Sequence, residues 1–166
     1  RRGMRPVIAG GAEAWLVATE LAAAKAAVVL DPLVNLPASF DALGARLDNA
    51  ARLQRAGVVV VFSMTGLAPH FAHKVRQSAG NAVAHGMPWD AALAGLTANP
   101  AAVFGLGASR GRIETGMVAD LVLWNGDPLE VTSAADQVWV GGKPMSMRSR
   151  QTELLDRYLP EASRQA

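Results

Sequence analysis

The sequence contains no cysteine among its 166 residues. Disulfide scaffolds, thiol nucleophiles and cysteine-based zinc sites are therefore excluded together for these residues. Aromatic residues make up only 5% of the chain, so we expect small aliphatic side chains to fill the core. A lack of cysteine is also compatible with a cytoplasmic protein, and the cytoplasm is the location that we expect.

Excess charge of one sign and long apolar runs are scarce as well. The formal net charge of +2 is too small to indicate nucleic-acid binding, and the arginines near the two ends are not interleaved with aromatic residues. No stretch reaches the roughly 18 uninterrupted apolar residues that a membrane-spanning helix needs. Arg1-Arg2 is not followed by the apolar segment of a signal peptide. We therefore expect neither nucleic acid nor membrane as a partner.

The first part of the chain alternates short apolar runs with helical patterns. The run 58–62 has no polar alternation, which indicates burial on both faces, as in a parallel sheet covered by helices. An all-helical domain is the competing interpretation, because Ala-rich segments are ambiguous. The order strand, helix, strand, helix, strand is that of βαβ units. The expected strands are 6–9, 26–30 and 58–62, and the expected helices are 12–25 and 43–56.

Beyond residue 62 the pattern changes to helices and then to strands. We expect Pro88 at the first position of one helix and Asn99 as the N-cap of the next. The four tryptophans lie singly at helix or strand positions and are expected in the core. The expected helices are 70–85, 88–96, 99–104 and 151–158, and the expected strands are 121–124, 137–140 and 144–147.

The most informative stretch of the sequence is the run 111–128. Gly116 permits a positive φ, and Asp120 can bond neighbouring backbone donors before the apolar run 121–124. A second tight turn around Asp127 then ends the predicted strand. Both aspartates are therefore expected to be turn and strand-boundary residues. A strand–turn unit of this kind occurs in many folds and by itself names no function.

The residue pattern of this run resembles the C-terminal signature of the metal-dependent amidohydrolase superfamily, especially its imidazolonepropionase-like and prolidase-like members. Segments 80–83 and 91–101 resemble the same superfamily. The resemblance implies an α/β fold: the last three βα units of a (β/α)8 TIM-type barrel plus part of a small β-sandwich. The implied divisions are 1–108 for the barrel part, 109–148 for strands of the composite sandwich and 149–166 for a C-terminal helix or tail.

The resemblance also implies an activity. Members of the superfamily hydrolyse C–N bonds of amides, cyclic amides or dipeptide-like substrates with water that a divalent metal, typically zinc, activates. Three strands cannot close a barrel, which needs about 250 residues. We therefore expect the chain to be a fragment, a cleaved product or one component of an assembly, either a homo-oligomer or a complex with an upstream chain.

Two departures from the family pattern lead us to expect impaired catalysis. The family has an aspartate just after the eighth barrel strand, and the matching stretch 62–67 contains no carboxylate. The end of the sixth strand, residues 9–11, lacks a histidine. Two alternatives stay open: a non-catalytic relative that binds a ligand or partner through the old pocket, or a structural subunit that completes a partner's barrel.

No residue stands out as a firm catalytic group or metal ligand. His70 and His73 are weak metal candidates, since residues three apart can share a helix face; the alternative is a solvated or helix-starting pair. Ser63 and Thr65 are candidates for a substrate pocket or are plain polar strand-end residues. Asp31 follows a predicted strand and is either a pocket residue or a turn residue before proline.

Overall fold

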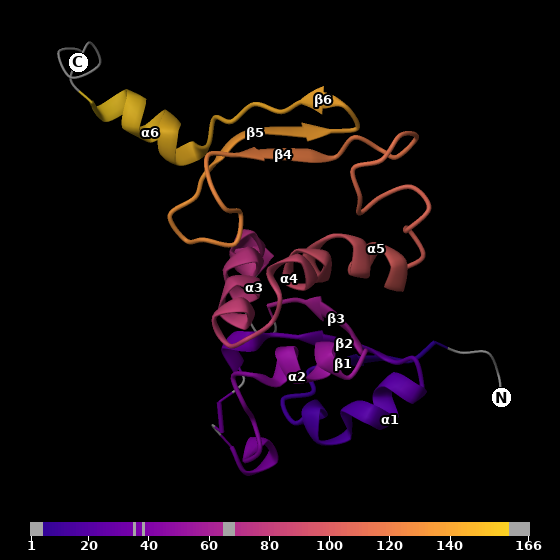
Figure 1. The fold of residues 1–166 in the computed structure, drawn as a ribbon. Coiled ribbons are helices and arrows are strands. Elements are labelled where there is room, and N and C mark those ends of the chain that lie inside the picture. The colour runs from indigo at the N-terminus through magenta and orange to yellow at the C-terminus, as the bar shows by residue number, and fades with distance from the viewer. Residues whose placement is uncertain (1–4, 35, 38, 65–68, 160–166) are drawn as a thin grey trace.

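The computed structural model of the chain describes residues 5–34, 36–37, 39–64 and 69–159. Figure 1 shows a parallel sheet with helices on both of its faces, and an antiparallel sheet on the far side of one of these two groups of helices. The expectation of a mixed α/β fold is confirmed. The competing all-helical interpretation is wrong, because the apolar runs are paired as strands.

The parallel sheet consists of β1 (Val7–Ala9), β2 (Ala27–Leu30) and β3 (Val59–Phe62). The order is β1-β2-β3, and both pairings are parallel. The chain crosses between these strands through α1 (Ala18–Ala23) and α2 (Asn49–Arg55), as the predicted βαβ order requires. Within the described residues β1 and β3 each have one unpaired edge.

Small aliphatic side chains fill the core around the middle strand, as the scarcity of aromatic residues predicts. Val28 and Leu30 of β2 are fully buried, and so is Leu53 of α2. Ala50 and Ala92 are also fully buried, which lets their helices approach closely. The run 58–62 is buried as predicted except at Val59, which is 42% exposed.

Three helices follow the parallel sheet: α3 (Val75–Ala84), α4 (Trp89–Leu96) and α5 (Ala98–Val103). The predicted helix 70–85 begins as the 3-10 segment η4 (Pro69–Lys74) and becomes an α-helix only at Val75. Asn99 is not an N-cap, so that expectation is wrong. It lies inside α5, where its Nδ2 donates to the Val60 carbonyl at 2.9 Å and ties the helix to β3.

The predicted helices 12–25 and 43–56 are shorter than expected. The first divides into the 3-10 segment η1 (Ala14–Val17) and α1, and the second begins only at Asn49. Two further 3-10 turns, η2 (Pro32–Val34) and η3 (Phe40–Ala42), lie in the long connection after β2. Leu43 is 65% exposed because the chain around it is held as a loop through backbone contacts at Gly44.

The antiparallel sheet is built from β4 (Leu121–Trp124), β5 (Ala135–Val140) and β6 (Lys143–Pro144) in that order. Strand β5 begins two residues before the predicted start, and a register shift opposite Leu123 and Trp124 absorbs an extra residue. Strand β6 is shorter than predicted.

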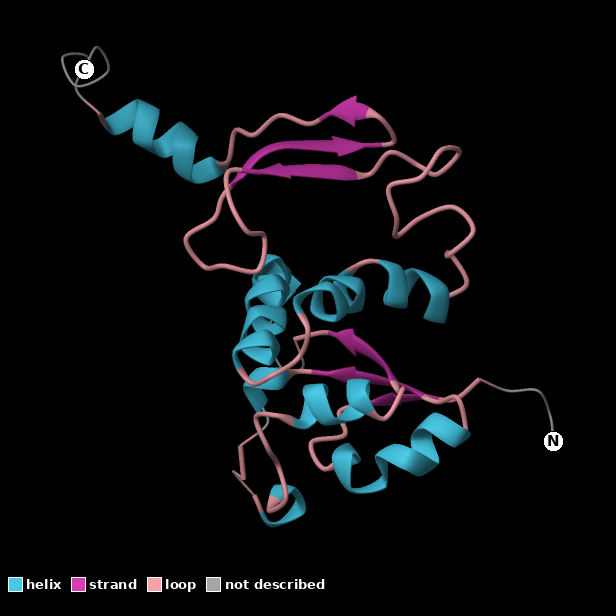
Figure 2. Cartoon of the chain, in the orientation of Figure 1, coloured by secondary structure: helices cyan, strands magenta, loops and turns pink. Residues whose placement is uncertain are grey.

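The last described helix is α6 (Arg150–Tyr158), which begins with a capping box at Ser149. It projects away from the body, as Figures 1 and 2 show, and none of its side chains is buried. None of the helices in the described residues has the length and apolar character that a bilayer crossing requires.

Candidate functional site

The carboxyl edge of the parallel sheet carries the sequence candidates that the structure describes best. Gly10, Asp31 and Ser63 directly follow β1, β2 and β3. The ladder continues past the strands, since Gly10 donates to Val29 at 3.0 Å and Ser63 donates to Leu30 at 2.8 Å. Ligands of parallel α/β sheets bind outside this edge. Asp31 and Ser63 therefore lie where the family resemblance would put a pocket.

Asp31 has the contacts of a turn residue. Its Oδ1 accepts from the Leu33 N–H at 3.1 Å, and the residue is only 4% exposed. A carboxylate used in this way stabilises the turn that starts the loop after β2. Ser63 is half-buried beside it. A role of either residue in substrate binding stays a prediction.

The remaining candidates do not assemble into a described site. Thr65 lies outside the described residues. His70 and His73 both belong to η4, but the side chain of His70 is outside the described part, and that of His73 is exposed. No group of three or more His, Cys, Asp or Glu side chains in the described ranges could hold a metal ion. A catalytic zinc needs about three protein ligands, so these residues do not fit one.

Asn49 is a site-forming residue that the sequence did not single out. Its side chain is fully buried at the start of α2. Nδ2 donates to the carbonyls of Gly11 and Ala12 at 2.9 and 3.2 Å, and Oδ1 accepts from the Trp15 N–H at 3.1 Å. These bonds join the loop after β1 to the loop after β2. Only the tertiary structure brings the partners together, across more than 30 residues of sequence.

The ring of Trp15 contacts the guanidinium groups of two arginines. The guanidinium carbons of Arg46 and Arg52 lie 5.3 and 4.9 Å from the centre of its ring. Asp48 joins them, with Arg46 Nε at 2.7 Å and Arg52 Nε at 2.8 Å. The hydrogen bond from Arg46 is the main cause of a pKa of Asp48 far below its usual value; partial burial opposes the shift, and Arg52 adds to it. This cluster joins η1 to the start of α2.

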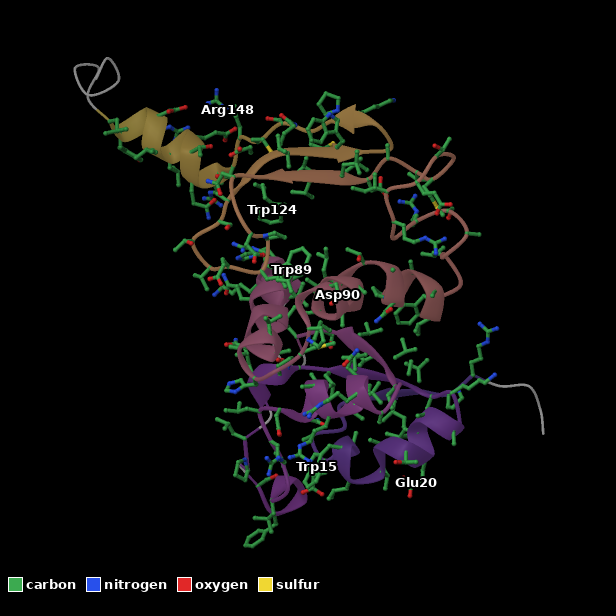
Figure 3. The ribbon with its side chains drawn as sticks, in the orientation of Figure 1. Trp15, Glu20, Trp89, Asp90, Trp124 and Arg148 are labelled. Atoms are coloured by element: carbon green, nitrogen blue, oxygen red, sulfur yellow. The ribbon has the colours of Figure 1, made fainter. Side chains whose placement is uncertain are left out.

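A cavity of about 890 Å³ lies between the helices and the antiparallel sheet, well apart from the carboxyl edge. Most of its lining is apolar, with Leu93 and Phe104 from the helical side and Val122 from β4. Figure 3 labels Trp89 and Asp90 on the helices and Trp124 on the sheet, on the two sides of this space.

Arg76 fastens the sheet to the helices at one end of the cavity. From α3 its guanidinium donates to the carbonyls of Pro128 at 3.0 Å and Ser133 at 2.8 Å, and also to that of Glu130. The same group lies over the ring of Trp124, 4.9 Å from its centre. The Arg76 side chain therefore bonds the loop between β4 and β5 at three carbonyl groups.

A second contact fixes the same loop. The indole N–H of Trp89 donates to the carboxylate of Asp127 at 2.9 Å, and Asp127 Oδ1 accepts from the Leu129 N–H at 2.8 Å. A Cβ on Gly80 would lie 2.4 Å from the Leu129 carbonyl oxygen, so only glycine allows α3 to approach this loop. The turn role predicted for Asp127 is confirmed, and the structure adds its bond to α4.

The expectation that the tryptophans fill the core is wrong. Trp15, Trp124 and Trp139 are half-buried, and Trp89 is 42% exposed. The rings of Trp15, Trp89 and Trp124 make contacts between segments, since a large amphipathic ring can offer a face to a cation or its N–H to an oxygen. The sequence held a signal for this: Trp15 and Trp89 each lie within four residues of a turn or a helix start.

Parallel βα units followed by an antiparallel sheet define an α/β protein with two sheets. The family model described as "Amidohydrolase family" matches residues 56–145, more than half of the chain. The chain therefore belongs to the amidohydrolase family, as the resemblance of the run 111–128 implied.

Individual relatives agree. An amidohydrolase from Thermotoga maritima MSB8 has a solved structure that matches with a TM-score of 0.76 and 30% identity over 86% of this chain. Amidohydrolase tasK of Hapsidospora irregularis is 47% identical over 58 residues, which is 35% of this chain. An adenosine deaminase from Xanthomonas campestris with bound zinc matches at a TM-score of 0.61 and 20% identity over 90% of this chain, which shows a common fold alone.

The chain spans only part of these proteins. It covers 37% of the Thermotoga structure, 40% of the Xanthomonas structure and 6% of the tasK protein.

Proposed function

We propose that this chain is the C-terminal portion of an amidohydrolase-type fold whose reaction is hydrolysis of a C–N bond by metal-activated water. The observation that carries the proposal is the family match over residues 56–145, joined to a parallel sheet whose outer strands each have one edge that no other described strand pairs with. In this proposal β1, β2 and β3 are the last three strands of a barrel, and residues 109–148 belong to a composite sandwich.

As a second part of the proposal, the chain does not catalyse this reaction by itself. In the described residues, the carboxyl edge offers a glycine, a turn-bound aspartate and a serine at the three strand ends. A serine has no carboxylate to accept a proton from water near neutral pH, and Asp31 is only 4% exposed and bonds the turn that follows β2. When a divalent metal is bound, it supplies the acidified water of the family reaction. The described residues of this chain hold no group of three such ligands, so the proposal assigns ligands to other polypeptide.

The proposed substrate is a small amide-type molecule, and the proposed setting is the cytoplasm, in an assembly that provides the remaining strands. A binding role without catalysis remains the alternative function. The two functions are distinguished by measuring the melting temperature of the chain with simple amides and dipeptides, in the presence and absence of a chelator. Stabilisation that survives the chelator favours binding alone.

The test is elemental analysis of the purified chain together with hydrolysis assays on an acyl amide, a cyclic amide and a dipeptide, with and without added zinc. We expect less than one zinc per chain and no turnover. The control variant is His85→Ala, an exposed histidine at the end of α3. Stoichiometric zinc with turnover, both lost in His73→Ala and kept in His85→Ala, would contradict the proposal.

A further inference from the structure

The connection between β2 and α2 exposes large apolar side chains to water. Phe40 is 91% exposed and Leu43 is 65% exposed, and Leu33 and Leu36 are half-exposed. Figure 1 shows this connection extending away from the parallel sheet before the chain returns to α2. Residues 32–43 are named the apolar loop below, because Asp41 is their only charged residue.

The two most exposed side chains of the apolar loop lie on one side of a turn. Phe40 begins the 3-10 turn η3, and Leu43 follows it with right-handed helical angles, φ −61° and ψ −33°. Side chains three positions apart eclipse one another in a 3-10 turn. Phe40 and Leu43 therefore form one apolar surface.

Polar contacts hold the apolar loop in place at both ends. Beside Leu43, the Gly44 N–H donates to Glu13 Oε1 at 2.5 Å, and the Gly44 carbonyl accepts from the indole N–H of Trp15 at 2.8 Å. At the other end, Asp31 accepts from the Leu33 N–H at 3.1 Å. The apolar side chains are thus presented on an ordered segment, which lowers the entropic cost of binding a partner. Exposed apolar groups gathered in this way mark an interaction surface.

The size of the apolar loop suits an interface between two copies of the chain. Taking roughly 200 Å² for each fully exposed large side chain, its four apolar side chains expose on the order of 500 Å². An interface of standard size buries about 800 Å² from each partner, of which about 450 Å² is non-polar. The loop therefore supplies about the non-polar share that each copy contributes to a standard interface.

The charges near the apolar loop favour a second copy over other kinds of partner. Arg46 and Arg52 are both paired with Asp48, so they offer little field to a nucleic acid or an acidic protein. Apolar segments that enter a membrane surface are flanked by Lys or Arg, whereas the charge beside Phe40 is that of Asp41. In a two-fold interface the same surface meets itself, and a surface with so few charges does this with little like-charge repulsion.

We propose that the apolar loop is a two-fold contact surface on which a second copy of this chain docks, with Phe40 and Leu43 of each copy at its centre. The loop follows the middle strand β2, so this contact is separate from the edges of β1 and β3 that no other described strand pairs with. The inference does not depend on the hydrolytic reaction proposed above.

Sedimentation equilibrium of the purified chain over a range of concentrations measures the proposed self-association. Phe40→Lys and Leu43→Lys change the apolar loop, and Val131→Lys is the matched control. Val131 lies in the loop between β4 and β5 and is 69% exposed, close to the value for Leu43. All three positions are exposed, so the melting temperature of each variant should stay near that of the unchanged chain.

A second measurement uses the lack of cysteine in the chain. Phe40→Cys and Val131→Cys each introduce a single thiol that can carry a nitroxide label. Dipolar electron paramagnetic resonance then gives the distance between the labels of two associated copies. This distance reports which surface lies at the two-fold axis.

We expect an equilibrium between monomer and dimer. Phe40→Lys and Leu43→Lys should each raise its dissociation constant by at least about tenfold, as the loss of a central interface contact does, and Val131→Lys should change it by less than about twofold. Labels at position 40 should lie closer together than labels at position 131. A chain that stays monomeric overturns the inference, including one that binds phosphatidylcholine vesicles through Phe40 instead. Association that is equally sensitive to Leu43→Lys and Val131→Lys also overturns it, and so do labels at position 40 that are no closer than those at position 131.

Discussion

Removing the Arg76 side chain should release the antiparallel sheet from the helices while leaving the parallel sheet intact. The guanidinium donates to three carbonyls of the loop between β4 and β5 and lies over Trp124. In Arg76→Ala these acceptors lose their partner together. The neighbouring bond from Trp89 to Asp127 remains, so we expect easier local opening rather than global unfolding.

The size of the effect follows from the burial of each acceptor. Hydrogen bonds to charged groups contribute about 1.5–3 kcal/mol each when they are shielded from water. The bonds to Pro128 and Ser133 are partly buried, whereas the one to Glu130 is exposed and its carbonyl can be rehydrated. Freeing a long side chain returns up to about 2 kcal/mol of rotamer entropy. We therefore expect about 2–3 kcal/mol, or a 30- to 150-fold larger open population.

Hydrogen exchange resolved by residue measures this opening. Amides of 121–134 should exchange faster in Arg76→Ala, while those of Val28 and Val60 in the parallel sheet should keep their rates. The control is Arg55→Ala, because Arg55 Nε donates only within its own helix, to Ala51 at 3.2 Å. Arg76→Lys should recover less than half of the loss, since an ammonium cannot reproduce the planar fork of donors. Equal exchange in the Arg76 and Arg55 variants would refute the reasoning.

Two further predictions concern the loops at the carboxyl edge. Asn49→Ala should lower the free energy of unfolding in urea by about 2–4 kcal/mol, because two buried carbonyls and one N–H lose their partner; Gln54→Ala on the same helix should change it by less than about 0.5 kcal/mol. Similar losses in both would contradict the proposed role. Asp48→Asn tests the pH dependence. A carboxyl group whose pKa is lowered in the folded state contributes stability above its unfolded value of about 3.9 and loses that contribution as pH falls toward the folded-state pKa. The stability difference from the unchanged chain, about 0.5–1 kcal/mol for so exposed a cluster, should therefore be constant above about pH 5 and shrink steadily as the pH is lowered further; a difference that does not shrink between about pH 5 and pH 2 would refute it.

Local patterns predicted the elements whose causes are local. The continuous apolar runs at β2 and β3 form strands because they are short and rich in β-branched residues, which pack well on a sheet covered on both faces. The run 111–128 formed the expected turn, strand and turn, with Gly116 at a φ of +89°. The residue pattern of this run also identified the family. Asp127 behaves as a turn residue because its bond to the Leu129 N–H spans only two positions.

Predictions failed where a distant partner decides the outcome. Residues 43–48 have a helical apolar pattern, but Trp15 and Glu13 bond the backbone at Gly44 and hold the segment as a loop. Asn99 has the chemistry of an N-cap, yet α5 begins one residue earlier, at Ala98, and the Asn99 side chain donates to the Val60 carbonyl on β3. In both cases a contact more than 25 residues away outweighs local preference, which amounts to only about 1 kcal/mol.

The sequence by itself determined the family, the mixed α/β class and the absence of thiol chemistry, because these depend on residue identity and short-range order. The tertiary structure decided which polar groups meet: Asn49 with the loop after β1, and Arg76 with the loop after β4. Such meetings depend on the directions of side chains and backbone groups in three dimensions, which no spacing along the chain encodes.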